Sequence, residues 1–168
     1  MGSLFTQNQF LFLEMAGVWR LLVAGLLGAF LGLERSIAGK HAGMRTYALV
    51  SMGSALFVIV GTLGSYQLSS FPGLNPLQIA ASIVIGIGFI GSGLAAYSGG
   101  SQELTTAAGV WVASGIGMAA GFGLFITALA STIFAIVLFT FAARIESAAQ
   151  GKYGREREDT VGSIGKID

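Results

Sequence analysis

The stretch FGLFITALASTIFAIVLFTFAA, Phe122–Ala143, contains no charged residue. An α-helix rises about 1.5 Å per residue, so a helix of this length can cross the roughly 30 Å hydrocarbon core of a bilayer. The stretch therefore predicts a membrane-spanning helix, and with it the fold class of the chain.

Four further apolar stretches precede this one. They are Ala16–Leu33, Tyr47–Leu63, Leu77–Tyr97 and Leu104–Ala120. The chain is 54% hydrophobic and 10% charged, whereas a soluble domain carries about 25% charged residues. We therefore expect an all-α, polytopic transmembrane bundle of about five spans over residues 1–143. The fourth stretch is short and rich in glycine, so a re-entrant helix is the alternative there.

Local signals mark two boundaries. Asn75-Pro76 predicts an N-cap followed by proline at the first position of the third helix. Residues 151–168 are charged, mixed in sign and poor in apolar side chains, which predicts disorder. We therefore expect residues 144–168 to form a charged, flexible tail in the cytoplasm.

The basic residues predict the orientation in the membrane. Eight of the nine Lys and Arg residues lie in the first loop or after the fifth span, and such loops stay in the cytoplasm. With five spans, the N-terminus then lies outside the cell and the C-terminus in the cytoplasm. In this orientation Tyr47 is predicted to belong to an aromatic belt at the inner interface.

The same topology brings charged and hydroxyl side chains together at the cytoplasmic end. Near lipid, such charges favour partners, and we expect the pairs Glu34–Arg45 and Arg35–Glu103. The alternative is that these charges only fix the orientation of the helices at the interface. The candidate polar cluster consists of Glu34, Arg35, Arg45, Thr46, Glu103, Thr105 and Thr106.

Glycines spaced along the predicted spans indicate close helix packing, and their number favours a homodimer or higher oligomer. The candidate packing residues are Gly28, Gly32, Gly86, Gly93, Gly117 and Gly121. A second pattern is internal: Met44–Val50 resembles Leu104–Val110. This similarity predicts a parallel two-span repeat whose pseudo-axis follows the membrane normal.

No catalytic, metal-binding or cofactor-binding pattern is present in the sequence. There is no cysteine, and the single histidine, His41, lies in a basic loop. The sequence GIGFIG, Gly86–Gly91, matches a dinucleotide-binding motif, but it lies inside a predicted span without a preceding strand. We therefore expect a protein without enzymatic activity, cofactor or metal, whose surroundings are the lipid bilayer and other membrane proteins rather than nucleic acid.

Three blocks of sequence resemble the MgtC/SapB family of bacterial membrane proteins. They are GAFLGLER (Gly28–Arg35), AGMRTYALV (Ala42–Val50), and GIGFIGSG (Gly86–Gly93) with LTTAAGVW (Leu104–Trp111). The resemblance implies a multi-span protein of the bacterial inner membrane, associated with magnesium homeostasis at low magnesium, stress adaptation and virulence. It also implies action on other membrane machinery, the ATP synthase included, rather than transport of magnesium.

The chain departs from the family pattern at three places. Gln102-Glu103 stands where the family usually has Arg-Gly, and Tyr47 stands where it often has histidine. The soluble C-terminal domain of the longer family members is absent, so the resemblance is to a short form. The replacement at Glu103 changes the charge of the polar cluster.

Two functions remain open from the sequence. The first is a regulator that modulates another membrane complex, favoured because the spans offer no continuous polar pathway between the two interfaces. The alternative is a transporter of a small solute or ion, Mg²⁺ included, with the polar cluster as its cytoplasmic gate. A measurement of solute or ion flux across the membrane of liposomes that contain the protein distinguishes the two functions.

Overall fold

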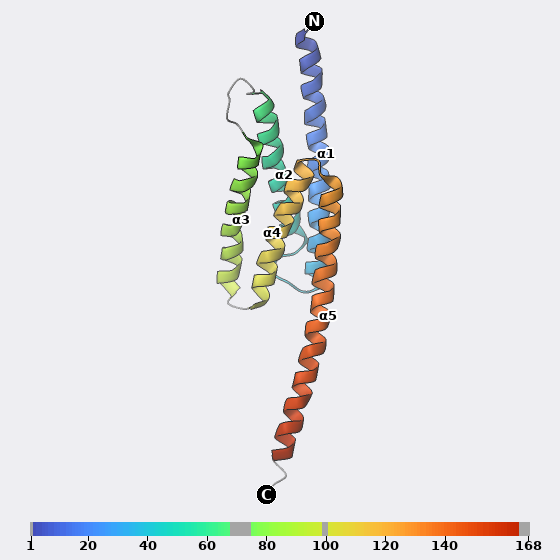
Figure 1. The fold of residues 1–168 in the computed structure, drawn as a ribbon, viewed down its shortest axis with the longest axis vertical. Coiled ribbons are helices and arrows are strands. Elements are labelled where there is room, and N and C mark those ends of the chain that lie inside the picture. Colours follow the sequence, from blue (N-terminus) through green and yellow to red (C-terminus); the bar gives the residue numbers. More distant parts are fainter. Residues whose placement is uncertain (1, 68–74, 99–100, 165–168) are drawn as a thin grey trace. The chain divides into compact units, whose positions relative to one another are not determined.

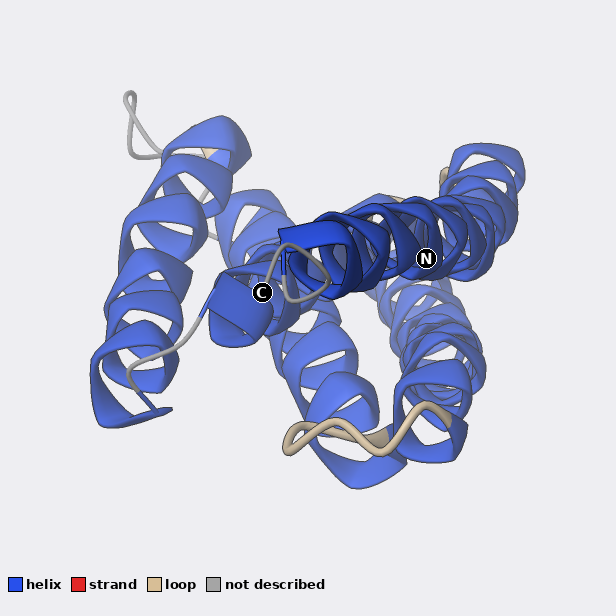
Figure 2. Cartoon of the chain, turned by 90° about the horizontal axis from the view of Figure 1, so that it is seen from below, coloured by secondary structure: helices blue, strands red, loops and turns tan. Residues whose placement is uncertain are grey.

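The structure, a computed structural model, describes residues 2–67, 75–98 and 101–164. Within these residues the secondary structure is helical, with no strand (Figure 2). This confirms the expected all-α fold. The helices, shown in Figure 1, are α1 (Gly2–Ile37), α2 (Met44–Gln67), α3 (Pro76–Ser98), α4 (Ser101–Gly121) and α5 (Phe125–Ile164).

Each helix contains a segment long and apolar enough to cross a membrane, which confirms the expected five spans. The segments are Asn8–Ile37, Met44–Ser65, Leu77–Leu94, Leu104–Gly121 and Phe125–Ile145. The fourth has the lowest mean hydropathy, 1.3, against 1.8 to 2.3 for the others. It is nevertheless part of one unbroken helix of 21 residues, about 32 Å long, as a full span requires.

The low hydropathy of α4 has a structural cause. Half of its spanning segment is buried, against 33% in α2, 11% in α1 and 6% in α3. Helix α4 packs against α1, α2 and α3, so many of its side chains face other helices rather than lipid. Small and hydroxyl residues suit such contacts, because they allow backbones to approach closely. The weakest span in the sequence is therefore the most buried of the five spanning segments.

Helices α2 and α4 run parallel to each other. Contacts between them join Tyr47 to Thr106, Ser54 to Ser114, and Ala55 to Gly121, so positions advance in the same direction along both helices. A parallel two-span repeat would need this arrangement (Figure 1). The repeat itself stays a prediction.

Two helices end at a glycine in the left-handed region, Gly39 with φ 68° and Gly123 with φ 83°. After each glycine, the next amide bonds back to a carbonyl five residues earlier, which caps the last turn. These bonds are Lys40 N–H to Arg35 O, 3.0 Å, and Leu124 N–H to Ala119 O, 2.8 Å. Sharp turns at both points let the chain reverse after α1 and after α4.

The start of α3 has the predicted cap. Asn75 Oδ1 accepts a hydrogen bond from the Leu77 amide at 2.9 Å, and Pro76 is the first helical residue. Asparagine at this place satisfies an amide that has no partner within the helix. The sequence signal at Asn75-Pro76 is confirmed.

The chain divides into two compact units, Met1–Ala135 and Ile136–Asp168. In the second unit α5 continues as helix to Ile164, although the composition after Gly151 predicts disorder. Extending an existing helix adds a hydrogen bond for each residue without a new nucleation cost. The division into a membrane domain, 1–143, and a flexible tail, 144–168, stays a prediction.

Candidate functional site

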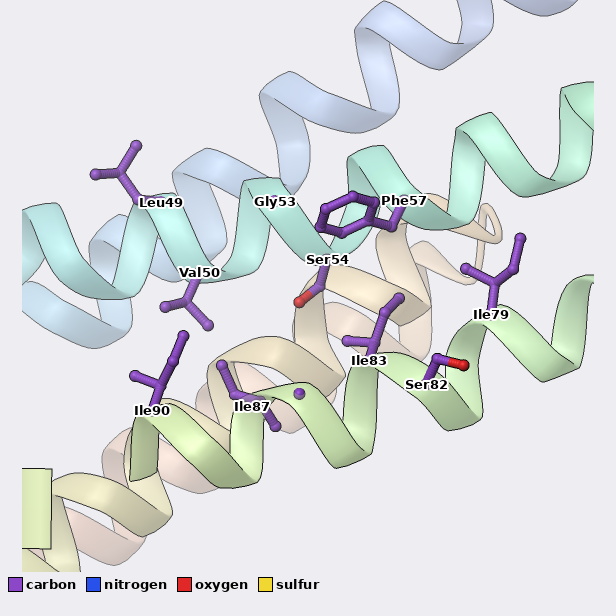
Figure 3. A pocket seen from close by; sticks show the side chains of 11 residues that line it. Leu49, Val50, Gly53, Ser54, Phe57, Ile79, Ser82, Ile83, Ile87 and Ile90 are labelled. Carbon is purple, nitrogen blue, oxygen red and sulfur yellow. The ribbon is translucent and has the colours of Figure 1, made fainter. Parts of the chain in front are cut away.

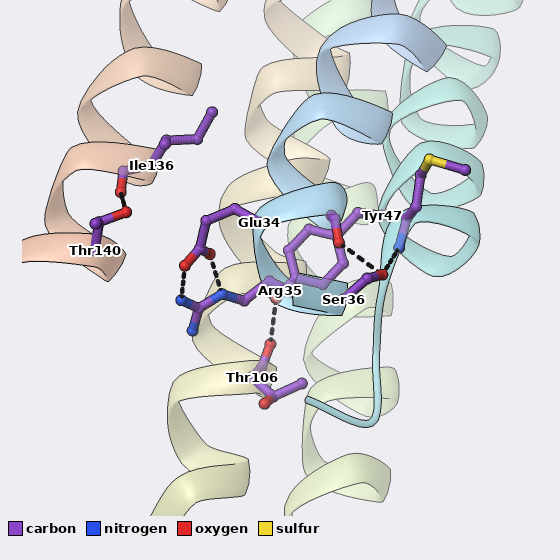
Figure 4. A network of polar contacts seen from close by, with 9 residues as sticks. Glu34, Arg35, Ser36, Tyr47, Thr106, Ile136 and Thr140 are labelled. Atoms are coloured by element: carbon purple, nitrogen blue, oxygen red, sulfur yellow. Dashed lines mark hydrogen bonds and ion pairs between the residues drawn. The ribbon is translucent and has the colours of Figure 1, made fainter. Parts of the chain in front are cut away.

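The last turn of α1 and the first turns of α2 and α4 lie at one end of the first unit, which we call the charged end (Figure 4). A short loop, residues 38–43, connects α1 to α2 there. The Tyr47 hydroxyl donates a hydrogen bond to the Thr106 carbonyl oxygen at 3.2 Å, which joins α2 to α4. Residues that are far apart in the sequence therefore meet at this end.

Glu34 and Arg35 form a two-point ion pair at the charged end. Arg35 Nη2 donates to Glu34 Oε1 at 2.6 Å, and Arg35 Nε donates to Glu34 Oε2. Arg35 is 3% exposed, and the Glu34 side chain is 20% exposed. The two-point geometry neutralises both charges at the end of α1.

The expected pairing of Glu34 with Arg45 is wrong. Glu34 pairs with its sequence neighbour Arg35, and Arg45 is exposed. Side chains three or four residues apart are neighbours on a helix, whereas adjacent positions do not face each other. Helical spacing therefore does not predict this pair. The long side chains of Glu34 and Arg35 reach each other beyond the helix surface, as Figure 4 shows.

The other members of the predicted cluster differ in burial. Thr106 is 1% exposed and Thr46 is half-buried, whereas Thr105 is exposed. The side chain of Glu103 lies outside the described residues, although its position belongs to the first turn of α4 and hence to the charged end. Its pairing with Arg35 stays a prediction.

Tyr47 lies in the core and not in an interfacial aromatic belt, which corrects the sequence interpretation. Its side chain is fully buried. A Cβ placed on Gly32 would stand 2.8 Å from Tyr47 Cβ, so the missing side chain at Gly32 makes room for the tyrosine. A signal for this was present: Tyr47, Ser51 and Ser54 follow helical spacing and mark one face of α2.

The hydroxyl groups on this face of α2 have partners inside the bundle. Ser51 Oγ donates to the Ala24 carbonyl oxygen at 2.8 Å, which joins α2 to α1. Ser54 Oγ and Ser114 Oγ are 2.8 Å apart and join α2 to α4. Sequence reasoning missed these residues, because serines scattered in apolar spans do not reveal their partners.

Replacing Ser54 by alanine is expected to lower the free energy of unfolding by about 1 kcal/mol, because the buried Ser114 hydroxyl loses its partner. The double variant Ser54→Ala with Ser114→Ala is expected to cost less than twice as much, since no hydroxyl is then left unpaired at this contact. Reversible unfolding in detergent micelles measures both. Strict additivity of the two single variants contradicts the contact.

Four of the predicted packing glycines lie where an added side chain would press against a neighbouring helix, and at three of them it would collide with it. A Cβ on Gly28 would stand 2.6 Å from the Tyr47 carbonyl oxygen, and one on Gly117 would stand 1.9 Å from the Ser51 carbonyl oxygen. The corresponding nearest distances are 2.7 Å at Gly32 and 3.0 Å at Gly121. Helices α1 and α4 therefore each approach α2 backbone to backbone.

The two predicted packing glycines of α3 have a different environment. A Cβ on Gly86 or Gly93 would meet no atom within 4 Å among the described contacts. Both are glycines within an apolar helix, as Gly117 and Gly121 are, but they make no close contact with another described helix.

A further residue that sequence reasoning missed is Arg20, which lies inside the span of α1. Its Nη1 donates to the Gly121 carbonyl oxygen at 3.1 Å, at the last residue of α4. Carbonyls at a helix C-terminus carry partial negative charge, so a cation there is stabilised. The available signal was the charge itself, because an arginine within a span requires a partner.

Comparison with known proteins matches residues 21–148 to the MgtC family. The matched region contains residues 21–37 of α1, the whole of α2 to α4, and the whole spanning segment of α5, Phe125–Ile145. The chain belongs to the MgtC family. This confirms the family resemblance that the three sequence blocks indicated.

Relatives within the MgtC family come from several bacteria. The chain is 44% identical over 109 residues to the putative magnesium transporter YhiD of Escherichia coli K12, which covers 63% of this chain and 51% of YhiD. It is 36% identical over 149 residues to SrpB of Synechococcus elongatus, covering 83% of this chain and 81% of SrpB. It is 43% identical over 117 residues to MgtC of Salmonella typhimurium LT2, covering 69% of this chain and 48% of that protein.

The chain thus aligns with about half the length of YhiD and of the Salmonella protein. No solved structure matches it.

Among the described residues of this MgtC-family protein, no group of three or more His, Cys, Asp or Glu side chains could hold a metal ion. The chemistry at the charged end is therefore that of a neutralised ion pair beside buried hydroxyl and carbonyl groups.

Proposed function

We propose that this MgtC-family protein is a non-enzymatic regulator of another complex in the bacterial inner membrane. Its charged end faces the cytoplasm in this proposal, and the apolar outer faces of its helices bind the partner. One observation carries the proposal: α1 and α4 each pack backbone to backbone against α2, and the buried hydroxyls of Tyr47, Ser51 and Ser54 are each hydrogen-bonded within the bundle.

This packing favours a rigid scaffold over a conduit. Many secondary transporters bind their substrates at discontinuous helices near the middle of the bilayer. In this chain α2, α3 and α4 are each continuous over their described lengths. Hydroxyls that already bond to the protein offer less to a passing solute, and the closely packed glycines leave little room between the three helices.

The second candidate is transport of a small ion such as Mg²⁺. It is favoured by the name of the relative YhiD, a putative magnesium transporter, and by the carboxylate of Glu34. Mg²⁺ binds through one or two carboxylates and retained waters. Both oxygens of Glu34, however, contact the Arg35 guanidinium, so a cation would have to displace this arginine first.

Reconstitution into proteoliposomes with a trapped Mg²⁺ indicator tests the proposal directly. We expect influx equal to that of protein-free liposomes, for the natural sequence and for Glu34→Gln alike. In parallel, ATP-driven proton pumping is compared in inverted bacterial membrane vesicles with and without the protein, with Arg45→Ala as a control expected to behave like the natural sequence. A change in pumping supports regulation of the ATP synthase, the partner implied by the family resemblance.

Two outcomes contradict the proposal. Mg²⁺ influx above background that Glu34→Gln abolishes establishes transport in its place. Unchanged proton pumping, together with failure of the protein to co-purify with any inner-membrane complex from its own bacterium, removes the regulatory role.

A further inference from the structure

A cavity of about 530 Å³ lies between α2 and α3 (Figure 3). Its α3 wall includes Ile79, Ile83 and Ile87, which repeat every four residues along one face of that helix. Val50 and Phe57 line the opposite wall on α2. The cavity is thus bounded by two stripes of apolar side chains that face each other.

Glycines open this cavity from both sides. Gly53 of α2 and Gly86 of α3 both belong to its lining, and a Cβ on either would meet no atom within 4 Å. At Gly117, by contrast, a Cβ would collide with the backbone of α2. The glycines at the cavity therefore do not serve close packing; their missing side chains leave space between α2 and α3.

The lining offers a ligand little besides apolar surface. Its two hydroxyl groups both have protein partners: Ser54 Oγ contacts Ser114 Oγ at 2.8 Å, and Ser82 Oγ donates to the Gln78 carbonyl oxygen at 3.0 Å. Water occupies a cavity when it finds two to four polar partners there, and apolar cavities stay dry. An empty space of this size would also forfeit the dispersion contacts of its lining.

The cavity is continuous with the surface that contacts lipid. Both walls belong to spanning segments, and three large apolar lining residues are exposed on the outside of the helices: Leu49 (63%), Phe57 (60%) and Ile90 (45%). What surrounds this surface is hydrocarbon. We propose that the cavity between α2 and α3 binds an acyl chain of a membrane phospholipid.

The test uses photo-cross-linking in phosphatidylethanolamine–phosphatidylglycerol vesicles that contain a phospholipid with a diazirine on its acyl chain. Labelled peptides are mapped by mass spectrometry. The informative variant is Gly86→Leu, which fills the cavity. Its matched control is Gly88→Leu on the same helix, because Gly88 also has open space around it but does not line the cavity.

The natural sequence and Gly88→Leu are expected to be labelled at lining residues of α2 and α3 more strongly than at exposed residues of α5 such as Phe134. In Gly86→Leu this excess is expected to fall roughly tenfold, the change that corresponds to about 1.4 kcal/mol of binding free energy. Labelling at the lining no higher than at Phe134, or an equal loss in both variants, overturns the proposal.

A second measurement distinguishes lipid from a second copy of the chain. A benzophenone amino acid in place of Phe57, at the rim of the cavity, is irradiated in the same vesicles. A covalent lipid adduct supports the proposal, and a covalent dimer of the chain in place of that adduct overturns it.

Discussion

Gly117→Ala is expected to lower the free energy of unfolding of the bundle by about 3 kcal/mol, the upper end of the usual cost of overpacking. The new methyl carbon would stand 1.9 Å from the Ser51 carbonyl oxygen and 2.6 Å from the Ser51 carbonyl carbon. A flexible side chain could move aside, but these atoms belong to the backbone of α2. The substitution therefore forces α2 and α4 apart and weakens their other contacts.

Gly115→Ala, on the same helix and two residues away, is the matched control. A Cβ there would meet nothing within 4 Å. Since alanine favours helix over glycine by about 1 kcal/mol, this variant is expected to be as stable as the natural sequence or slightly more so. Reversible unfolding by SDS in mixed micelles, followed by circular dichroism, measures both variants. Equal stabilities for Gly117→Ala and Gly115→Ala contradict the close approach of α2 and α4.

Arg35→Ala is expected to be the second strongly destabilising substitution. Removing one partner of a buried ion pair costs about 3–5 kcal/mol, and because Glu34 retains 20% exposure we expect about 2–4 kcal/mol here. The loss has two sources: the carboxylate of Glu34 is left without its guanidinium partner, and the buried stem of Arg35 leaves a void at the charged end.

A double-mutant cycle with Glu34→Gln separates these two sources. If the ion pair carries the effect, Arg35→Ala costs clearly less in the Glu34→Gln background than in the natural sequence. Arg45→Ala is the control, because Arg45 is exposed and surface substitutions change stability by about 0.5 kcal/mol or less. A cost for Arg45→Ala equal to that for Arg35→Ala contradicts the pairing seen in the structure.

Local patterns predicted much of the fold. Long apolar stretches require helices that cross the bilayer, and five such spans are present in the described residues. Asn75-Pro76 predicted a helix start because capping depends only on neighbouring residues. The fourth span had the weakest signal for a reason that the structure makes clear: half of it is buried among other helices, where glycine and hydroxyl residues replace large apolar ones.

The sequence predicted which end of the bundle holds the candidate site, but not which of its residues contact each other. Glu34, Arg35 and Thr106 meet at one end of the bundle, as the order of the spans requires. The predicted partner of Glu34 was wrong, because the pairing depends on the conformations of two long side chains. The burial of Tyr47 was missed, because it depends on room left by a glycine of another helix.

By itself the sequence determined the helical membrane fold, the cap at the start of α3 and the family, since each follows from residues close together in the chain. Only the tertiary structure decided which glycines make contacts: Gly117 touches the backbone of α2, whereas Gly86 opens a cavity. Both are glycines in apolar helices, and their local chemistry is the same. What differs is the rotation of each helix about its axis and its distance from its neighbour, which are set by the packing of all the helices together.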